Sequence, residues 1–300
     1  MKTNLLKKYS KSFYWASFFL SSEIYNKSLI IYNYCRTLDD IADLNPEFFN
    51  ELYKNEQHKQ YAGKNSKEIL SIYKTYWRSK NDYELTTKAM YNLFEKEKIS
   101  RKIVEDLFDG LESDCQEKIQ LDSKKLLIYC YRVAGTVGLM MSKILKVNDR
   151  NSIKGAIDLG IAMQLTNIAR DVIEDKNMGR QYINHDFESI IKTIKLADVF
   201  YNSSFGAIKS IPLKYRFSII VARRVYREIG YKIIRLKNLE NYNNSGKIYI
   251  STFEKIIQTI LSISDLVKIS FTKVENHKLK KEYGIIMEKI NLDERIWLYN

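Results

Sequence analysis

Apolar residues recur along this chain mostly at intervals of three and four, the spacing that places side chains on one face of an α-helix. Only 2 prolines and 11 glycines interrupt this rhythm, which favours long helices over many short strands. The pattern predicts helices over 28–43, 50–61, 66–78, 84–96, 99–118, 123–146, 150–176, 188–210, 214–238 and 251–270.

The breaks between these segments contain residues that end helices. Pro46 follows the first predicted helix, residues 178–180 end the long one, and Pro212 separates the next two. Ser100 is a predicted N-cap, and the polar run 241–246 is predicted as a loop. Since no repeat or linker divides the chain, we expect one all-α domain of roughly ten helices over residues 1–300.

The chain carries a formal net charge of +13. Such a surplus attracts anions, namely nucleic acid, anionic lipid or phosphorylated substrates, although a solvated lysine-rich surface explains it equally well. No basic run resembles a nucleic-acid-binding arm, and the aromatic residues form no RNA-binding signature, so we expect no nucleic acid partner.

The 3 cysteines and 3 histidines are too scattered for a zinc site, a disulfide framework or a Cys–His catalytic pair. Cysteine usage of this kind fits a reducing cytoplasm. The apolar patch 13–20 near the start is interrupted by serines, and no apolar run reaches the ~18 residues of a membrane-spanning helix. We therefore expect a cytoplasmic chain.

The first chemical signal lies in the predicted helix 28–43. Tyr32, Arg36, Asp39 and Asp43 fall on one narrow stripe of that helix, with the two aspartates one turn apart. Adjacent carboxylates repel each other unless a cation lies between them, and such oxygen ligands suit Mg²⁺.

The predicted helix 150–176 repeats the arrangement. Gln164, Asn167, Asp171 and Asp175 share a stripe, while the neighbouring positions are apolar. A polar stripe on so apolar a helix must face a cavity, a partner group or an ion, because burying it unpaired is costly.

Two such pairs facing each other across a helical bundle would hold several Mg²⁺ ions, or Mn²⁺ in their place. The ions would neutralise a diphosphate as a leaving group, and Arg36 and Arg170 could pair with its oxygens. The resulting carbocation needs a dry apolar cavity. Segment 129–141 can form its wall, because Ala134 and Gly138 leave room on one face; Phe13, Phe18 and Phe19 are further candidates.

Five stretches in order resemble the squalene and phytoene synthase family: 10–13, 34–43, 129–138, 164–182 and 222–230. The resemblance covers about residues 9–260. It implies an all-α class I isoprenoid synthase bundle around a central apolar cavity, and head-to-head joining of two prenyl diphosphates through a cyclopropylmethyl diphosphate.

The resemblance also implies roles for single residues. Asp39, Asp43, Asp171 and Asp175 match the metal-binding aspartates of the family. Residues around the diphosphates would be Tyr32, Arg36, Gln164, Asn167 and Arg170, and substrate contacts would be Ser12, Phe13, Tyr129, Val133 and Tyr226. The chain departs from the family at Lys247, where an arginine that contacts phosphate is usual, and in 180–184, which lack the usual proline.

Segments 129–141 and 158–164 most resemble bacterial phytoene synthases, so we expect two geranylgeranyl diphosphates as substrates, phytoene as product and no use of NADPH. The alternative is a C30 enzyme that makes squalene, hydroxysqualene or dehydrosqualene from farnesyl diphosphate. A non-catalytic assembly factor is a distant alternative, since all four aspartates are present. Apolar substrates and a basic chain predict that the protein docks on an anionic membrane surface, at the inner face of the membrane.

Overall fold

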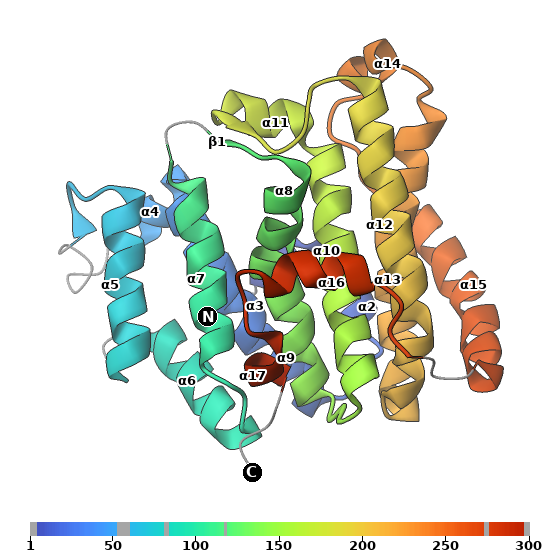
Figure 1. The fold of residues 1–300 in the computed structure, drawn as a ribbon, viewed down its shortest axis with the longest axis horizontal. Coiled ribbons are helices and arrows are strands. Elements are labelled where there is room, and N and C mark those ends of the chain that lie inside the picture. The colour runs from blue at the N-terminus through green and yellow to red at the C-terminus, as the bar shows by residue number, and fades with distance from the viewer. Residues whose placement is uncertain (1–4, 53–60, 81–83, 117–118, 273–275, 297–300) are drawn as a thin grey trace.

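The computed structural model describes residues 5–52, 61–80, 84–116, 119–272 and 276–296, and these residues are mainly helical (Figure 1). The helices are α1 (Leu5–Tyr9), α2 (Lys11–Ser17), α3 (Ser22–Ala42), α4 (Pro46–Leu52), α5 (Ser66–Ser79), α6 (Leu85–Glu97), α7 (Lys102–Asp114), α8 (Ser123–Cys130), α9 (Thr136–Ile144), α10 (Arg150–Arg170), α11 (Val172–Asn177), α12 (Phe187–Ala207), α13 (Leu213–Arg235), α14 (Leu239–Asn244), α15 (Thr252–Phe271), α16 (Lys280–Met287) and α17 (Leu292–Ile296). The predicted all-α class is confirmed.

Helix α10 lies at the centre of the bundle, where it packs against α9, α12 and α13 (Figure 1). The buried apolar side chains of α10 itself point in several directions, as expected of a helix enclosed by others. They are Ile153, Ile157, Ile161, Ala162, Leu165, Ile168 and Ala169. Two glycines bring the backbone of α10 against α9 and against the π-helical turn Tyr131–Gly135 that precedes α9. A Cβ on Gly138 would lie 2.1 Å from the Ala156 carbonyl oxygen, and one on Gly160 would lie 2.2 Å from that of Ala134.

Side-chain caps fix several helix starts near the predicted positions. The Asn65 side chain accepts from the Glu68 amide to open α5, and Ser251 does the same for Glu254 in α15; both form capping boxes. The prediction for Ser100 is wrong, because the N-cap of α7 is Arg101 and makes no side-chain bond. Ser100 is buried and instead offers its carbonyl to the Ile103 amide.

Two of the long predicted helices are interrupted. Segment 123–146 contains a π-helical turn, Tyr131–Gly135, between α8 and α9. Segment 150–176 breaks at Asp171, which separates α10 from α11. The Tyr242 hydroxyl explains the second break, since it lies within hydrogen-bond distance of the Ala169 and Arg170 carbonyls, which the next helical turn would otherwise use.

Other predicted boundaries also shift. The predicted loop 241–246 largely forms the short helix α14, which begins at the Asn238 side-chain cap. Pro46 opens α4, and the remainder of the predicted helix 50–61 lies mostly outside the described residues. Two two-residue strands, β1 (Ile119–Gln120) and β2 (Arg180–Gln181), pair in parallel and fix the backbone of Arg180 beside α11.

The C-terminal helices α16 and α17, which the hydrophobic pattern did not predict, fold back onto the bundle (Figure 1). The fully buried Asp158 carboxylate of α10 accepts hydrogen bonds from Ser203 and Tyr283 and lies 2.8 Å from His277 Nε2. Within the described part of the chain, every helix is too short or too polar to cross a membrane.

Candidate active site

The first aspartate pair lies at the C-terminal end of α3. Arg36 Nη1 donates to Asp39 at 2.9 Å, and its Nη2 donates to the buried Asp40 at 2.5 Å. Enclosure by protein, followed by the neighbouring Asp43 carboxylate, raises the pKa of Asp39 to about 7. Its side chain is nevertheless 46% exposed, so a cation arriving from solvent can reach it.

The second pair lies where α10 passes into α11. Arg170 holds the Asp171 carboxylate with two bonds, Nε to Oδ1 at 2.7 Å and Nη2 to Oδ2 at 2.5 Å. The Asp175 amide still donates to the Asp171 carbonyl across the break, so the two carboxylates keep their one-turn spacing. On the preceding turns, Asn167 Nδ2 lies 3.5 Å from Gln164 Oε1.

Arg180 connects the two pairs. Its Nη1 donates to Asp43 Oδ1 at 2.6 Å, and its positive charge also counteracts the rise in the pKa of Asp175. That pKa is raised to about 7, first by burial and then by the Asp171 carboxylate, with smaller contributions from Asp114 and Asp43. Because Arg180 pairs with Asp43 and lines the same cavity as Asp175, the structure brings the two acid-bearing segments together.

A buried network that the sequence analysis missed supports this junction. Tyr129 and Tyr182 each donate to Asp114, at 2.8 and 2.6 Å, and their rings stack with centroids 4.8 Å apart. Burial raises the pKa of Asp114 to about 6. Asp114 is the last residue of α7, where a negative charge opposes the helix dipole, but the helix predicted over 99–118 did not reveal that position.

The acid pairs fit magnesium by their chemistry. Each pair offers two neighbouring carboxylates, and Mg²⁺ characteristically takes one or two carboxylates together with substrate phosphates and water. No group of three acidic, histidine or cysteine side chains suited to a metal occurs in the described ranges. Within those ranges, two buried polar atoms beside the pairs, Arg36 Nε and Asn167 Oδ1, have no hydrogen-bond partner. A diphosphate oxygen and a cation-bound water would satisfy them, respectively.

Aromatic side chains lie next to the acids. The Phe13 ring of α2 stacks on Tyr226 of α13 with centroids 4.7 Å apart, and Tyr226 is buried. Burial raises the pKa of Tyr226, an effect that the nearby Arg170 opposes. Tyr32 of α3 is close enough to Tyr226 for the two phenols to interact electrostatically. Two predicted substrate contacts, Phe13 and Tyr226, and one residue predicted to lie near the diphosphates, Tyr32, therefore adjoin the metal-binding candidates.

The remaining predicted residues have mixed surroundings. Ser12, Val133 and Ala134 are half-buried, whereas the Tyr129 hydroxyl donates a hydrogen bond to Asp114. Gly138 packs against α10, so its missing side chain serves helix contact. The structure brings Lys247 to the second pair, where its Nζ lies 2.6 Å from Glu174. Phe19 packs on the core, but Phe18 is 60% exposed, so the prediction that it lines a cavity is wrong.

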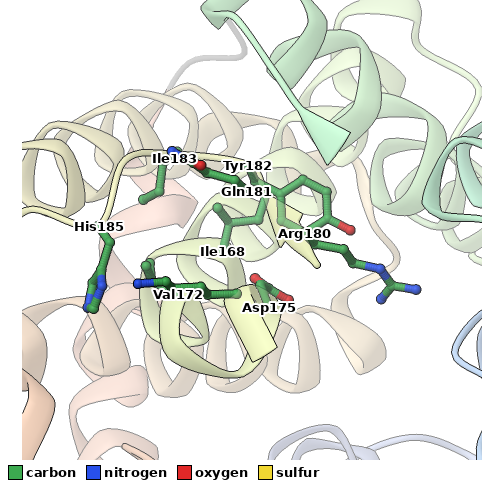
Figure 2. A pocket seen from close by; sticks show the side chains of 9 residues that line it. Ile168, Val172, Asp175, Arg180, Gln181, Tyr182, Ile183 and His185 are labelled. Carbon is green, nitrogen blue, oxygen red and sulfur yellow. The ribbon is translucent and has the colours of Figure 1, made fainter. Parts of the chain in front are cut away.

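A cavity of about 170 Å³ adjoins the second pair. Asp175, Ile168 and Val172 line it on one side, and Arg180 and Tyr182 line it from the β2 segment (Figure 2). Ligand pockets usually measure at least about 300 Å³, so this space suits a small polar group and not a prenyl chain. The long apolar chamber remains a prediction.

Comparison with known proteins identifies the family. The squalene/phytoene synthase family model matches residues 6–188. The chain is 29% identical to the 15-cis-phytoene synthase of Enterobacter agglomerans over 251 residues, which cover 75% of this chain and 82% of that protein. It is 28% identical to the phytoene synthase of Pseudescherichia vulneris over 294 residues, which cover 91% and 93%.

Solved structures agree with this assignment. A dehydrosqualene synthase solved with a ligand matches with a TM-score of 0.69 at 27% identity, over 88% of this chain and 94% of that one. A squalene synthase from Alicyclobacillus acidocaldarius shares the fold, with a TM-score of 0.63 at 16% identity over 79% and 92% of the two chains. Because the family model spans more than half of its residues, this chain belongs to the squalene/phytoene synthase family.

Proposed function

We propose that this chain is a prenyltransferase that joins two geranylgeranyl diphosphates head to head and releases phytoene. One observation carries the proposal: Arg180 pairs with Asp43 of the first acid pair and lines the same cavity as Asp175 of the second. The choice of C20 substrates is supported by relatives named phytoene synthases, which align over most of the chain.

The charged residues would bind and orient the diphosphates. Asp39 and Asp43 would hold Mg²⁺ on one side, and Asp171 and Asp175 on the other. Bound there, magnesium supplies the positive charge that makes diphosphate a good leaving group. Arg36 would donate its unpartnered Nε to a phosphate oxygen, while Arg170 and Lys247 add positive charge beside the second pair.

The bond changes follow from the departure of diphosphate. The C1–O bond of one substrate breaks, and the electron pair leaves with diphosphate. The allylic cation then forms a bond to the double bond of the second substrate, and loss of a proton closes a cyclopropylmethyl diphosphate. That compound ionises in turn, rearranges and loses a proton, so NADPH is not consumed. The Phe13, Tyr32 and Tyr226 rings would exclude water and face the cationic carbons.

A second candidate is the C30 reaction, in which two farnesyl diphosphates pass through the same steps to dehydrosqualene. The match to a dehydrosqualene synthase structure at 27% identity supports it. The two substrates differ in the length of their prenyl chains, so the length of the predicted apolar chamber would select between them.

The test is to incubate the purified protein and Mg²⁺ with geranylgeranyl or farnesyl diphosphate, with and without NADPH, and to identify the hydrocarbon by mass. We expect C40 phytoene, in equal yield without NADPH. Asp39→Ala and Asp171→Ala should abolish turnover and leave the circular dichroism spectrum unchanged. A C30 product alone would favour the second candidate, and no hydrocarbon from either substrate would refute both.

We propose further that the enzyme works in the cytoplasm, at the inner face of an anionic membrane. The basic surplus and the apolar character of the proposed substrates and product support this location.

A further inference from the structure

Helix α15 presents its apolar side to solvent and its polar side to the protein. Phe253 is 71% exposed, Ile260 60% and Phe271 84%. At 100° per residue, the exposed apolar positions form one broad stripe along all twenty residues of the helix. The stripe comprises Phe253, Ile256, Ile257, Ile260, Leu261, Ile263, Val267 and Phe271, and we call it the α15 face.

Specific polar contacts hold the opposite side of α15 against the bundle. Arg224 of α13 pairs with Asp265 at 2.6 Å, and Lys232 pairs with Glu254 at 2.8 Å. The Trp15 indole of α2 donates to Thr259 at 3.0 Å. These bonds fix the rotation of the helix, so the outward α15 face is built into the fold.

The α15 face is too apolar for an ordinary solvated surface. A surface helix normally buries its apolar stripe, and contiguous exposed apolar patches mark sites of protein or membrane interaction. Phe18 at the end of α2 is also exposed, and its ring lies against Trp15, which contacts α15. Figure 1 shows α15 at the outer edge of the bundle, away from α10.

The charges around the α15 face favour an anionic occupant. Both acids of α15 are neutralised by Arg224 and Lys232, as described above. Lys268 is exposed on α15, and Lys11 is exposed on α2 close enough to act on Lys255. Lys209 lies at the C-terminal end of α15, where it donates to the Ser270 and Thr272 carbonyls. The rim of the face is therefore basic.

We propose that the α15 face docks on an anionic lipid bilayer, with the helix lying in the plane of the interface. This inference deepens the proposed function, on which it rests for the biological need to meet lipid substrates. An apolar stripe flanked by lysines is the pattern of an interfacial helix, whose apolar side enters the headgroup boundary while the lysines meet anionic lipid. A second copy of the chain fits less well, because a symmetric contact would bring two basic rims together.

The α15 face lies close to the candidate active site. Helix α2 contacts α15 through Trp15 and contacts Tyr226 through Phe13, so α15 itself and one short helix lie between the α15 face and the aromatic residues of the site. Apolar substrate and product would thus have a short distance to cover between bilayer and site.

Co-sedimentation of the full chain with vesicles tests the proposal. The probes are phosphatidylglycerol-containing vesicles and pure phosphatidylcholine vesicles, each at low and high salt, without substrate. We expect binding to the anionic vesicles that weakens at high salt. Ile260→Asp should lower the partition coefficient by about tenfold or more, because it removes an apolar side chain from the lipid contact. Lys268→Gln should give a smaller loss on anionic vesicles only.

Leu85→Asp is the matched control, because Leu85 is 68% exposed but lies on α6, outside the α15 face. It should bind vesicles like the wild type, and thermal unfolding should show that all variants fold. Wild-type protein that stays in the supernatant with anionic vesicles would overturn the proposal, as would equal losses in Ile260→Asp and Leu85→Asp. So would a dimer in analytical ultracentrifugation that Ile260→Asp dissociates without any vesicle binding. Turnover in detergent micelles reports the proposed function separately, so failure of docking and failure of catalysis are distinguishable.

Discussion

Arg180 Nη1 lies 2.6 Å from Asp43 Oδ1, an ion pair between residues 137 positions apart in the chain. The same guanidinium opposes the rise in the pKa of Asp175, and its Nη2 reaches the Asp114 carbonyl at 3.4 Å. One side chain therefore touches or influences three acidic residues from three separate segments, and it is the main positive charge at their junction.

Replacing Arg180 should weaken catalysis more than folding. Arg180→Gln leaves Asp43 without its partner and increases repulsion among the acids, so we expect turnover to fall by about 100-fold, the scale of losing one preorganised electrostatic contact. Arg180→Lys should recover part of the lost turnover, because lysine keeps the positive charge. The recovery should be incomplete, because lysine lacks the forked donors of the guanidinium group. The control is Arg235→Gln, which removes an exposed pairing with Glu228. Equal turnover in Arg180→Gln and the control would contradict the assigned role.

The raised pKa of Asp175 predicts how stability depends on pH. An unfolded aspartate ionises near pH ~3.9, whereas in the fold the pKa is about 7. Between these values the folded chain binds the extra proton, so the stability of the metal-free protein should decrease as pH rises from about 4 to about 7.

Asp175→Asn should lessen that decrease, to which the raised pKa values of Asp39 and Asp114 also contribute. Above pH 7 in EDTA, we expect its Tm to exceed that of the wild type by about 2–6 °C, a range that allows for partial solvent screening. Adding Mg²⁺ should raise the Tm of the wild type and leave the variant nearly unchanged. Thermal unfolding followed by circular dichroism measures both effects. A variant less stable than wild type at pH 8 in EDTA would show that Asp175 is not under electrostatic strain.

Asp114 should contribute to stability because it accepts hydrogen bonds from two buried phenols. Asp114→Ala leaves Tyr129 and Tyr182 without their buried acceptor, which should cost about 2–4 kcal/mol, reduced somewhat by relief of repulsion with Asp43. Tyr182→Phe removes a single hydroxyl and should cost less. Urea unfolding of both variants gives the comparison, and an Asp114→Ala chain as stable as wild type would contradict the network.

Close packing of the π-helical turn Tyr131–Gly135 on α10 gives a sharper stability test. A Cβ at Gly160 would lie 2.2 Å from the Ala134 carbonyl oxygen, so Gly160→Ala forces the turn away from α10 and should cost at least about 2 kcal/mol. Gly284 of α16 has open space where a Cβ would be added. Gly284→Ala should therefore stabilise the chain by about 0.5–1 kcal/mol. Denaturant unfolding that ranks the two variants in the opposite order would exclude this packing.

The sequence was sufficient for features that lie within one helix. Asp39 and Asp43 are one turn apart on α3, and Asp171 and Asp175 keep that spacing across a break, so periodicity alone found both pairs. Asp114 and Arg180 were not assigned to the site, because each lies at the end of its element and joins the acids only through tertiary contacts.

The helix boundaries that the sequence did not predict also depend on tertiary contacts. Tyr242 interrupts the helix at Asp171 from a distance of about seventy residues, and no local pattern reports such a contact. Residues 241–246 were predicted as a loop because they are polar, yet Asn238 caps a helix over Leu239–Asn244 and Tyr242 is buried. The hydrophobic pattern predicted a helix over 251–270 but not its outward rotation, which Arg224 and Lys232 set by pairing with Asp265 and Glu254.

In the proposed reaction, both aspartate pairs act on one magnesium–diphosphate group. Calorimetric titration of Mg²⁺ in the presence of geranylgeranyl thiodiphosphate, an analogue that ionises very slowly, tests it on the wild type, Asp39→Asn and Asp171→Asn. We expect analogue-dependent Mg²⁺ uptake by the wild type and at least a tenfold weaker uptake by each variant, since removing one ligand or its support typically costs about 10–100-fold. Wild-type Mg²⁺ uptake by either variant would contradict it.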